Sequence, residues 1–171
     1  MKKIFAAFFV MVLACTTLFG CGSDAEKTTG TNQMDGTGKT SVRVGDLTIS
    51  LNDEMDSVRE SLGEPLEYVE SKSCMYEGYD KIYTYADVEI ITYPMNGKEY
   101  ISSINALTDN AVPGIDIQIG SSTDDIVEKY GEENLIMGKV YYIYETDEYG
   151  YSFYLGDDGI VSAIEVYVPT E

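Results

Sequence analysis

The strongest constraint on the fold is a pattern that the chain carries twice. Residues 57–65 read SVRESLGEP and residues 125–133 read DIVEKYGEE, so both mix apolar and charged side chains at helical spacing before reaching Gly-Glu. Apolar residues three and four apart predict a helix with one buried face, and glycine commonly follows a helix end. The predicted stripes are Met55, Val58 and Leu62, then Ile126, Val127 and Tyr130. Candidate N-terminal caps are Asn52 or Asp53, then Ser121 or Ser122.

Alternating strands flank both predicted helices. Residues 47–51 (LTISL) and 115–119 (IDIQI) precede them, and tyrosine-rich alternating stretches follow. Each half also contains a dipeptide typical of tight hairpins. These dipeptides are Asn96-Gly97 and Asp158-Gly159. The shared order predicts an α+β fold made by tandem duplication of a strand-helix-antiparallel-meander unit, with repeats at about 47–108 and 115–168 and helices packed on one face of the sheets.

The N-terminal residues have the layout of an export signal. Two lysines precede an apolar run at residues 4–15, which is shorter than the about 20 residues that a membrane-spanning helix needs. Residues 18–24 (LFGCGSD) then resemble a bacterial lipobox, which implies cleavage between Gly20 and Cys21 and a lipid on Cys21. A rival box ends at Cys15, but that cysteine lies inside the apolar run.

This layout predicts three segments. They are a lipoprotein signal peptide at 1–20, a lipidated cysteine with a flexible tether at 21–41, and a single domain at 42–171. The tether is rich in Gly, Ser and Thr and has too few apolar residues to build a core. We expect the lipid on Cys21 to hold the domain at the outer face of the cell membrane.

The charge of the chain excludes two classes of partner. It has 11 basic and 30 acidic residues and a net charge of −19. Loss of Lys2 and Lys3 with the signal leaves 11 − 2 = 9 basic residues, and therefore a net charge of 9 − 30 = −21. Nucleic acids and anionic lipid surfaces attract basic proteins, so we expect neither as a partner.

The residue types argue against catalysis. The chain has no histidine, which removes the commonest general base and metal ligand. Cys74 is the one cysteine of the predicted domain; we expect it to be a small buried residue, and the alternative is a reactive thiol or an intermolecular bridge. The GTGKT at 36–40 lacks the first glycine of a phosphate loop. We therefore expect no enzyme activity, cofactor or metal. Carboxylates lie on predicted turns at 109–116 and 155–159, so the alternative function is an acidic lipoprotein that binds a divalent cation or a small ligand.

Tyrosine supplies the remaining functional signal. The chain has 15 tyrosines, and many alternate along the predicted strands. Tyr83 and Tyr85 share one strand face, as do Tyr142 and Tyr144. Such rings either fill the core between sheet and helix or form an exposed face that binds a protein. The sequence leaves both open, and these four tyrosines are the candidate binding residues for an unknown protein partner.

A helix ending in V…(L/Y)GEP and followed by a tyrosine-rich sheet resembles the β-lactamase-inhibitor-protein-like fold, and the half-unit resembles the SmpA/OmlA outer-membrane assembly lipoproteins. With the lipobox, the tether and residues 74–94 (CMYEGYDKIYTYADVEIITYP), the chain is similar to uncharacterised lipoproteins of Gram-positive bacteria. The resemblance covers residues 47–168 and implies a binding or scaffolding role outside the membrane, without catalytic residues. Unlike the inhibitor proteins, the chain has no cysteine pair in its domain and no tryptophan.

Overall fold

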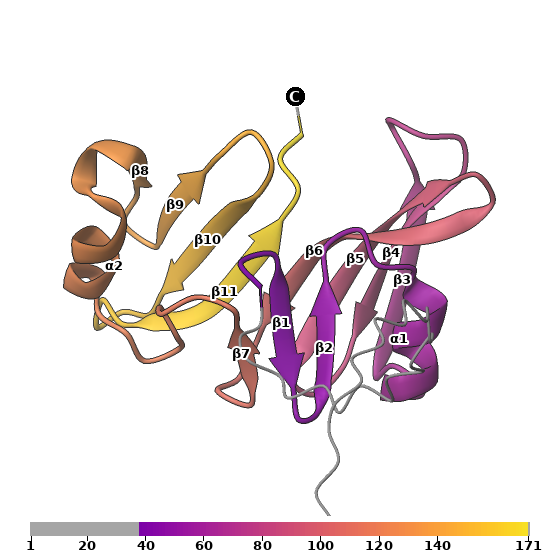
Figure 1. The fold of residues 1–171 in the computed structure, drawn as a ribbon, viewed down its shortest axis with the longest axis horizontal. Helices are drawn as coiled ribbons and strands as arrows, with labels where there is room; N and C mark the ends of the chain where they lie inside the picture. Colours follow the sequence, from indigo (N-terminus) through magenta and orange to yellow (C-terminus); the bar gives the residue numbers. More distant parts are fainter. Residues whose placement is uncertain (1–37, 171) are drawn as a thin grey trace, which may run out of the picture. The chain divides into compact units, whose positions relative to one another are not determined.

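Antiparallel strands dominate the fold. A computed structural model describes residues 38–170, and this range contains eleven strands, two α-helices and one 3₁₀ helix (Figure 1). In chain order they are β1 (Ser41–Val44), β2 (Leu47–Ser50), α1 (Met55–Leu62), β3 (Glu67–Lys72), β4 (Tyr79–Thr84), β5 (Val88–Met95), β6 (Lys98–Ala106), β7 (Ala111–Pro113), α2 (Thr123–Tyr130), η1 (Glu132–Asn134), β8 (Leu135–Met137), β9 (Tyr141–Glu145), β10 (Gly150–Leu155) and β11 (Val161–Tyr167).

The strands form one large and one small sheet. The large sheet has the order β3-β4-β5-β6-β11-β10-β9-β8, and the small sheet has the order β2-β1-β7. The large sheet is continuous because β6 pairs antiparallel with β11, which places Ile104 opposite Val166. Figure 1 shows α1 beside the β3 end of this sheet and α2 beside the β8 end, with the small sheet between them.

The predicted α+β tandem repeat is wrong. The strands make one sheet-dominated fold with two eight-residue helices, instead of repeated sheets that each carry a packed helix. Residues 115–119 do not form the expected strand. The preceding strand β7 stops at Pro113, which cannot donate to a ladder, and it pairs with β1 from the first half of the chain. Of the three isoleucines in 115–119, only Ile117 is fully buried.

Several local predictions are confirmed. The Asn96-Gly97 turn between β5 and β6 has φ values of 54° and 76°, as a tight hairpin requires. Ser122 caps α2: its hydroxyl accepts a hydrogen bond from the Asp125 backbone N–H, and the Asp125 carboxylate accepts one from the Ser122 N–H. For α1 the predicted caps are wrong, because the N-cap is Glu54 and its side chain makes no capping bond.

The core lies between the large sheet and the elements that cover one of its faces. Cross-strand register puts Tyr83, Ile90, Ile104, Val166 and Tyr151 in one row on this core face. All five are buried, together with residues of β1, β2 and both helices. The opposite face of the sheet, which we call the open face, carries polar side chains at its centre. This separation of faces decides which tyrosines can meet a partner.

The helices of the described residues are short. None in residues 38–170 is long and apolar enough to cross a bilayer.

Candidate binding sites

Two of the four predicted binding tyrosines lie in the core. Tyr83 is 2% exposed and Tyr85 is 7% exposed. The Tyr83 hydroxyl donates a 2.7 Å hydrogen bond to Glu99. Of the two alternatives that the sequence left open for this pair, the structure shows the core, because β4 turns both rings toward the face that the helix and small sheet cover.

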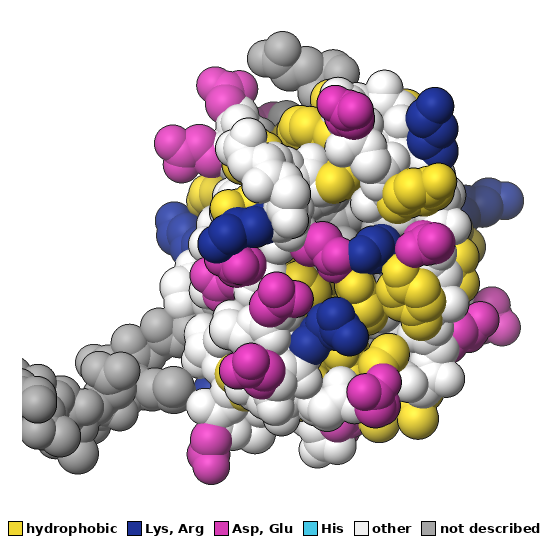
Figure 2. Space-filling model, turned by 90° about the vertical axis from the view of Figure 1, so that its right-hand side faces the viewer, with side chains coloured by type: hydrophobic (Ala, Val, Ile, Leu, Met, Phe, Trp, Pro, Cys, Tyr) yellow, Lys and Arg dark blue, Asp and Glu magenta, His cyan; other side chains and the backbone are white. Residues whose placement is uncertain are grey.

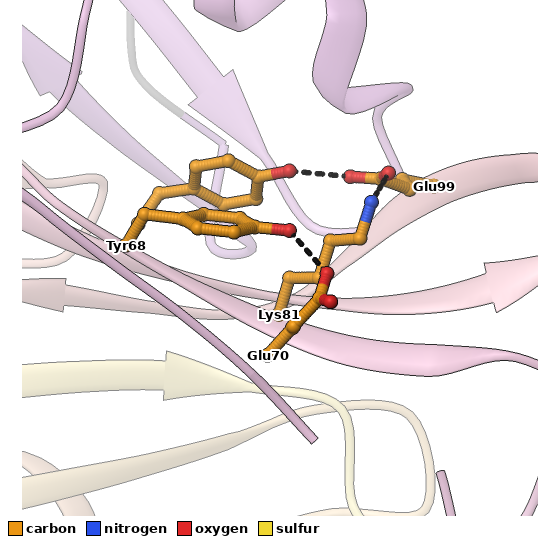
Figure 3. Close-up of polar contacts among 5 residues, drawn as sticks. Tyr68, Glu70, Lys81 and Glu99 are labelled. Atoms are coloured by element: carbon orange, nitrogen blue, oxygen red, sulfur yellow. Dashed lines mark hydrogen bonds and ion pairs between the residues drawn. The ribbon is translucent and has the colours of Figure 1, made fainter. Parts of the chain in front are cut away.

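A polar network closes the core beside these rings. Lys81 donates to one carboxylate oxygen of Glu99 while Tyr83 donates to the other. Figure 3 shows the neighbouring Tyr68, whose hydroxyl donates a 2.6 Å hydrogen bond to Glu70. Burial acts to raise the pKa of Glu99, but the bonds from Lys81 and Tyr83 outweigh it and lower that pKa. Since each polar group has a partner inside the network, we assign it a structural role.

The other two predicted tyrosines are half-buried at the opposite end of the sheet. Tyr142 and Tyr144 on β9 both pack against the core. The Tyr144 ring centroid lies 4.4 Å from that of Tyr130 on α2 and 6.1 Å from that of Tyr151 on β10. Tyr144 therefore belongs to an aromatic cluster between helix and sheet, and not to the open face.

This cluster lines a small cavity, which we call the tyrosine pocket. It measures about 200 Å³. The tyrosine pocket is lined by Lys39, Gly114, Ile115, Asp116, Lys129, Tyr130, Tyr144, Tyr149 and Tyr151. The Tyr151 hydroxyl donates a 2.8 Å hydrogen bond to the Lys39 carbonyl, and Lys129 forms an ion pair with Asp116.

A larger groove lies over the middle of the sheet, at β5, β6 and the end of β11, and we call it the loop groove. It measures about 480 Å³, within the roughly 300–1,000 Å³ typical of ligand sites. Three parts of the chain form it: the β3–β4 loop, the middle of β5 and β6, and the segment after β11. The lining residues are Ser73, Cys74, Met75, Tyr76, Asp80, Ile91, Thr92, Tyr93, Ser102, Val168, Pro169 and Thr170.

The β3–β4 loop is held over this groove by local contacts. The Ser73 hydroxyl accepts hydrogen bonds from the backbone N–H groups of Met75 and Tyr76, at 3.4 and 3.2 Å. Gly78 adopts φ +133°, and a Cβ there would lie only 2.9 Å from the Pro94 Cβ. Glycine therefore allows the loop to approach β5 closely, and this approach makes the wall of the groove.

The rim of the loop groove is aromatic and rich in sulfur. Met75 is 63% exposed and Tyr76 is 42% exposed. The Tyr76 ring lies 5.0 Å from Tyr93, which lies 5.9 Å from Tyr100. Cys74 is a free thiol and exposed, so its predicted burial is wrong. The consecutive Cys-Met-Tyr in a glycine-containing connector was the sequence signal for this site, and the strand alternation drew attention to the wrong tyrosines.

Further apolar residues are exposed on the edge strand β3. Leu66, just before the strand, is 77% exposed, and Tyr68 and Val69 are 46% and 47% exposed. Figure 2 shows hydrophobic side chains on this side of the molecule, interspersed with basic and acidic ones. The patch has charges of both signs around it.

Carboxylates on the open face are satisfied by neutral donors. Glu89 accepts from Thr84 and Asn105, and Glu165 accepts from Ser103 and Tyr154. In residues 38–170 no group of three or more Cys, Asp or Glu side chains is placed to hold a metal ion. The open face therefore has the chemistry of a solvated, hydrogen-bonded sheet surface.

The predicted lipidation site lies outside the described residues. This applies to Gly20 and Cys21, to the rival Cys15, and to the phosphate-loop-like sequence up to residue 37.

Comparisons with known proteins give one distant match. No protein-family model matches the chain, and no curated protein is similar to it. Among solved structures, the chain is similar to a DUF4309 family protein (YjgB) from Bacillus subtilis subsp. subtilis str. 168. The two are 14% identical with a TM-score of 0.42, and the match covers 68% of this chain and 79% of the other.

Proposed function

We propose that the chain is a lipoprotein, anchored by Cys21 at the outer face of the cell membrane, whose domain is a non-catalytic module that binds a protein partner through the loop groove. The anchor rests on the order of lysines, apolar run and lipobox in residues 1–24. The single observation that carries the binding function is the loop groove itself, a hollow of about 480 Å³ with exposed aromatic and methionine side chains at its rim.

The side chains of the loop groove suit a protein ligand. Tyrosine and methionine are enriched at the cores of protein interfaces, and tyrosine buries a large area with little loss of conformational freedom. Met75 is unbranched and adapts to the shape of its partner. Tyr93 is better fixed, since its hydroxyl donates a 3.0 Å hydrogen bond to Asn52. The groove thus combines one rigid ring with adaptable neighbours.

Charge indicates which protein segment fits. Asp80 lines the groove, Glu77 lies in the adjoining loop, and the whole chain carries a net charge of −19. Like charges would repel an acidic partner, whereas an opposite charge speeds association. The occupant we propose is an extended protein segment with an apolar side chain in the groove and lysine or arginine beside it.

Photo-crosslinking in the cell that makes the protein tests this proposal. A photoreactive phenylalanine analogue at position 76 of the full chain should capture one discrete protein. Adding Tyr93→Ser should reduce this adduct on the order of fivefold, because the fixed ring of the groove is lost. The matched control carries the analogue at position 154, where Tyr154 is 40% exposed but lies on β10, away from the groove.

Adducts of equal yield from positions 76 and 154, or none from position 76, would refute binding through the loop groove.

A further inference from the structure

The tyrosine pocket has a positive lining in an otherwise acidic protein. Two lysines, Lys39 and Lys129, and one acidic residue, Asp116, line it, so its formal charge is 2 − 1 = +1. The whole chain, in contrast, carries −19. The three ion pairs within residues 38–170 use Lys81, Lys98 and Lys129, the last of them with Asp116. Lys39 is therefore the lysine of the pocket that has no acidic partner in this range.

The tyrosine rings of the pocket pack on one another. The Tyr130 ring centroid lies 4.4 Å from that of Tyr144 and 6.0 Å from that of Tyr151. The Tyr149 ring centroid lies 5.4 Å from that of Tyr151. Rings packed in this way offer a ligand their hydroxyl groups and outer edges instead of a set of free faces. A ring edge carries the positive part of the aromatic quadrupole, and a hydroxyl can donate a hydrogen bond, so both suit a negative group.

One hydroxyl of this cluster has no hydrogen-bond partner. Within residues 38–170 the Tyr130 hydroxyl is buried and unpaired, whereas the Tyr151 hydroxyl donates a 2.8 Å hydrogen bond to the Lys39 carbonyl. Burial raises the pKa of Tyr130, so its O–H stays protonated at neutral pH and can donate. A buried hydroxyl that has lost water without gaining a partner is unfavourable. The pocket is thus lined by an unused donor and an unpaired ammonium group.

We propose that the tyrosine pocket binds a small organic carboxylate. The Lys39 ammonium group supplies the opposite charge, and the Tyr130 hydroxyl donates a hydrogen bond to a carboxylate oxygen. One unpaired cation matches the single charge of a carboxylate better than the charge of about two on a phosphate group. The volume of about 200 Å³ is below the roughly 300–1,000 Å³ of most ligand sites, so the rest of the ligand is a small group that packs against Ile115 and the rings. This site is independent of the loop groove.

Amide NMR titration of the full-length protein tests this site with two probes of the same shape. Isobutyrate carries the negative charge, and isobutyramide is its neutral analogue. With ionic strength held constant and each probe added to about 100 mM, isobutyrate should shift amide signals in residues 114–116, 129–131 and 144–151 and bind at least about tenfold more tightly than isobutyramide. Equal affinity of the two probes, or no shift in these residues, would overturn the proposal. Tighter binding of inorganic phosphate than of isobutyrate would overturn the assignment to a carboxylate.

Two tyrosines with unpaired buried hydroxyls provide a matched pair of variants. Tyr130→Phe removes the proposed donor and should weaken isobutyrate binding about fivefold. Its thermal midpoint should not fall, because no hydrogen bond within residues 38–170 is lost. Tyr85→Phe removes the equivalent hydroxyl from a residue that directly follows β4, away from the pocket, and should leave binding unchanged. Wild-type affinity in Tyr130→Phe would overturn the assignment of its hydroxyl to the site.

A second pair of variants tests the charge. Lys39→Gln should weaken isobutyrate binding about tenfold and leave isobutyramide binding unchanged, because only the charged probe interacts with the ammonium group. The control is Lys98→Gln at the start of β6, which makes the same change in net charge at a lysine that pairs with Glu54. It should leave the binding of both probes unchanged. Equal weakening by the two variants would overturn the proposal, since the charge of the whole chain would then set the affinity.

Discussion

At the scale of single residues, the position of a tyrosine on a strand decides whether its side chain packs in the core or is exposed to a binding partner. Tyr83 and Tyr85 alternate as a binding pair would, yet both face the core. The alternation itself is visible in the sequence. Which face is covered depends on where α1 and the small sheet pack, and these contacts join residues far apart in the chain. The sequence therefore identified the rings but could not assign their face.

The Glu99 carboxylate gives a prediction on pH and stability. Burial acts to raise its pKa, but hydrogen bonds from Lys81 and Tyr83 lower it below the usual 4.5. A lowered folded pKa means that the ionised carboxylate stabilises the fold above pH 4.5 and that this contribution is lost as pH falls through the folded pKa. Glu99→Gln should cost about 0.5–1 kcal/mol at pH 7, allowing for solvent screening of a partly exposed pair.

Urea unfolding at pH 7, 4 and 3 measures this effect. The difference between wild type and Glu99→Gln should shrink toward pH 3. Glu60→Gln, an exposed position on α1, serves as the control and should follow the wild type. A difference that stays constant from pH 7 to pH 3 would show that the ionisation of Glu99 does not contribute.

At the scale of elements, local signals were the most reliable. Both helices lie where the apolar stripes and glycines predicted them, and both predicted hairpin turns join neighbouring strands. The predicted strand at 115–119 failed because alternation alone does not supply a partner strand. The predicted cap of α1 at Asp53 failed as well, because the residue type alone does not show which N–H group the carboxylate will bond. The Asp53 carboxylate accepts a hydrogen bond from the Ser50 backbone N–H instead.

The unequal caps of the helices give a second prediction. Ser122→Ala removes the capping box of α2, which should lower the free energy of unfolding by about 1 kcal/mol. Ser61→Ala on α1 is the control, because its hydroxyl bonds only to a carbonyl within the helix and alanine favours helix. Thermal unfolding followed by circular dichroism checks both. Equal midpoints for the two variants would contradict the stabilising role of the cap.

At the scale of the whole molecule, the decisive contact is the pairing of β6 with β11. It joins strands from the two halves into one sheet, in which the loop groove lies over the central strands and the tyrosine pocket lies at β9 and β10. No local pattern encodes this pairing, because the two strands are separated by more than fifty residues of chain. The loop groove was missed for the same reason: its walls come from three separate segments.

Cys74 allows one direct measurement of the proposed location and binding surface together. It is exposed, free and part of the loop groove. The measurement is the rate at which a membrane-impermeant maleimide alkylates Cys74 on intact cells, compared with the isolated protein. We predict alkylation without permeabilisation, several-fold slower than in the isolated protein because a partner covers the groove, and no reaction at Cys21 because its thiol carries the lipid. Alkylation that requires permeabilisation would contradict the outer location, and equal rates would contradict an occupied groove.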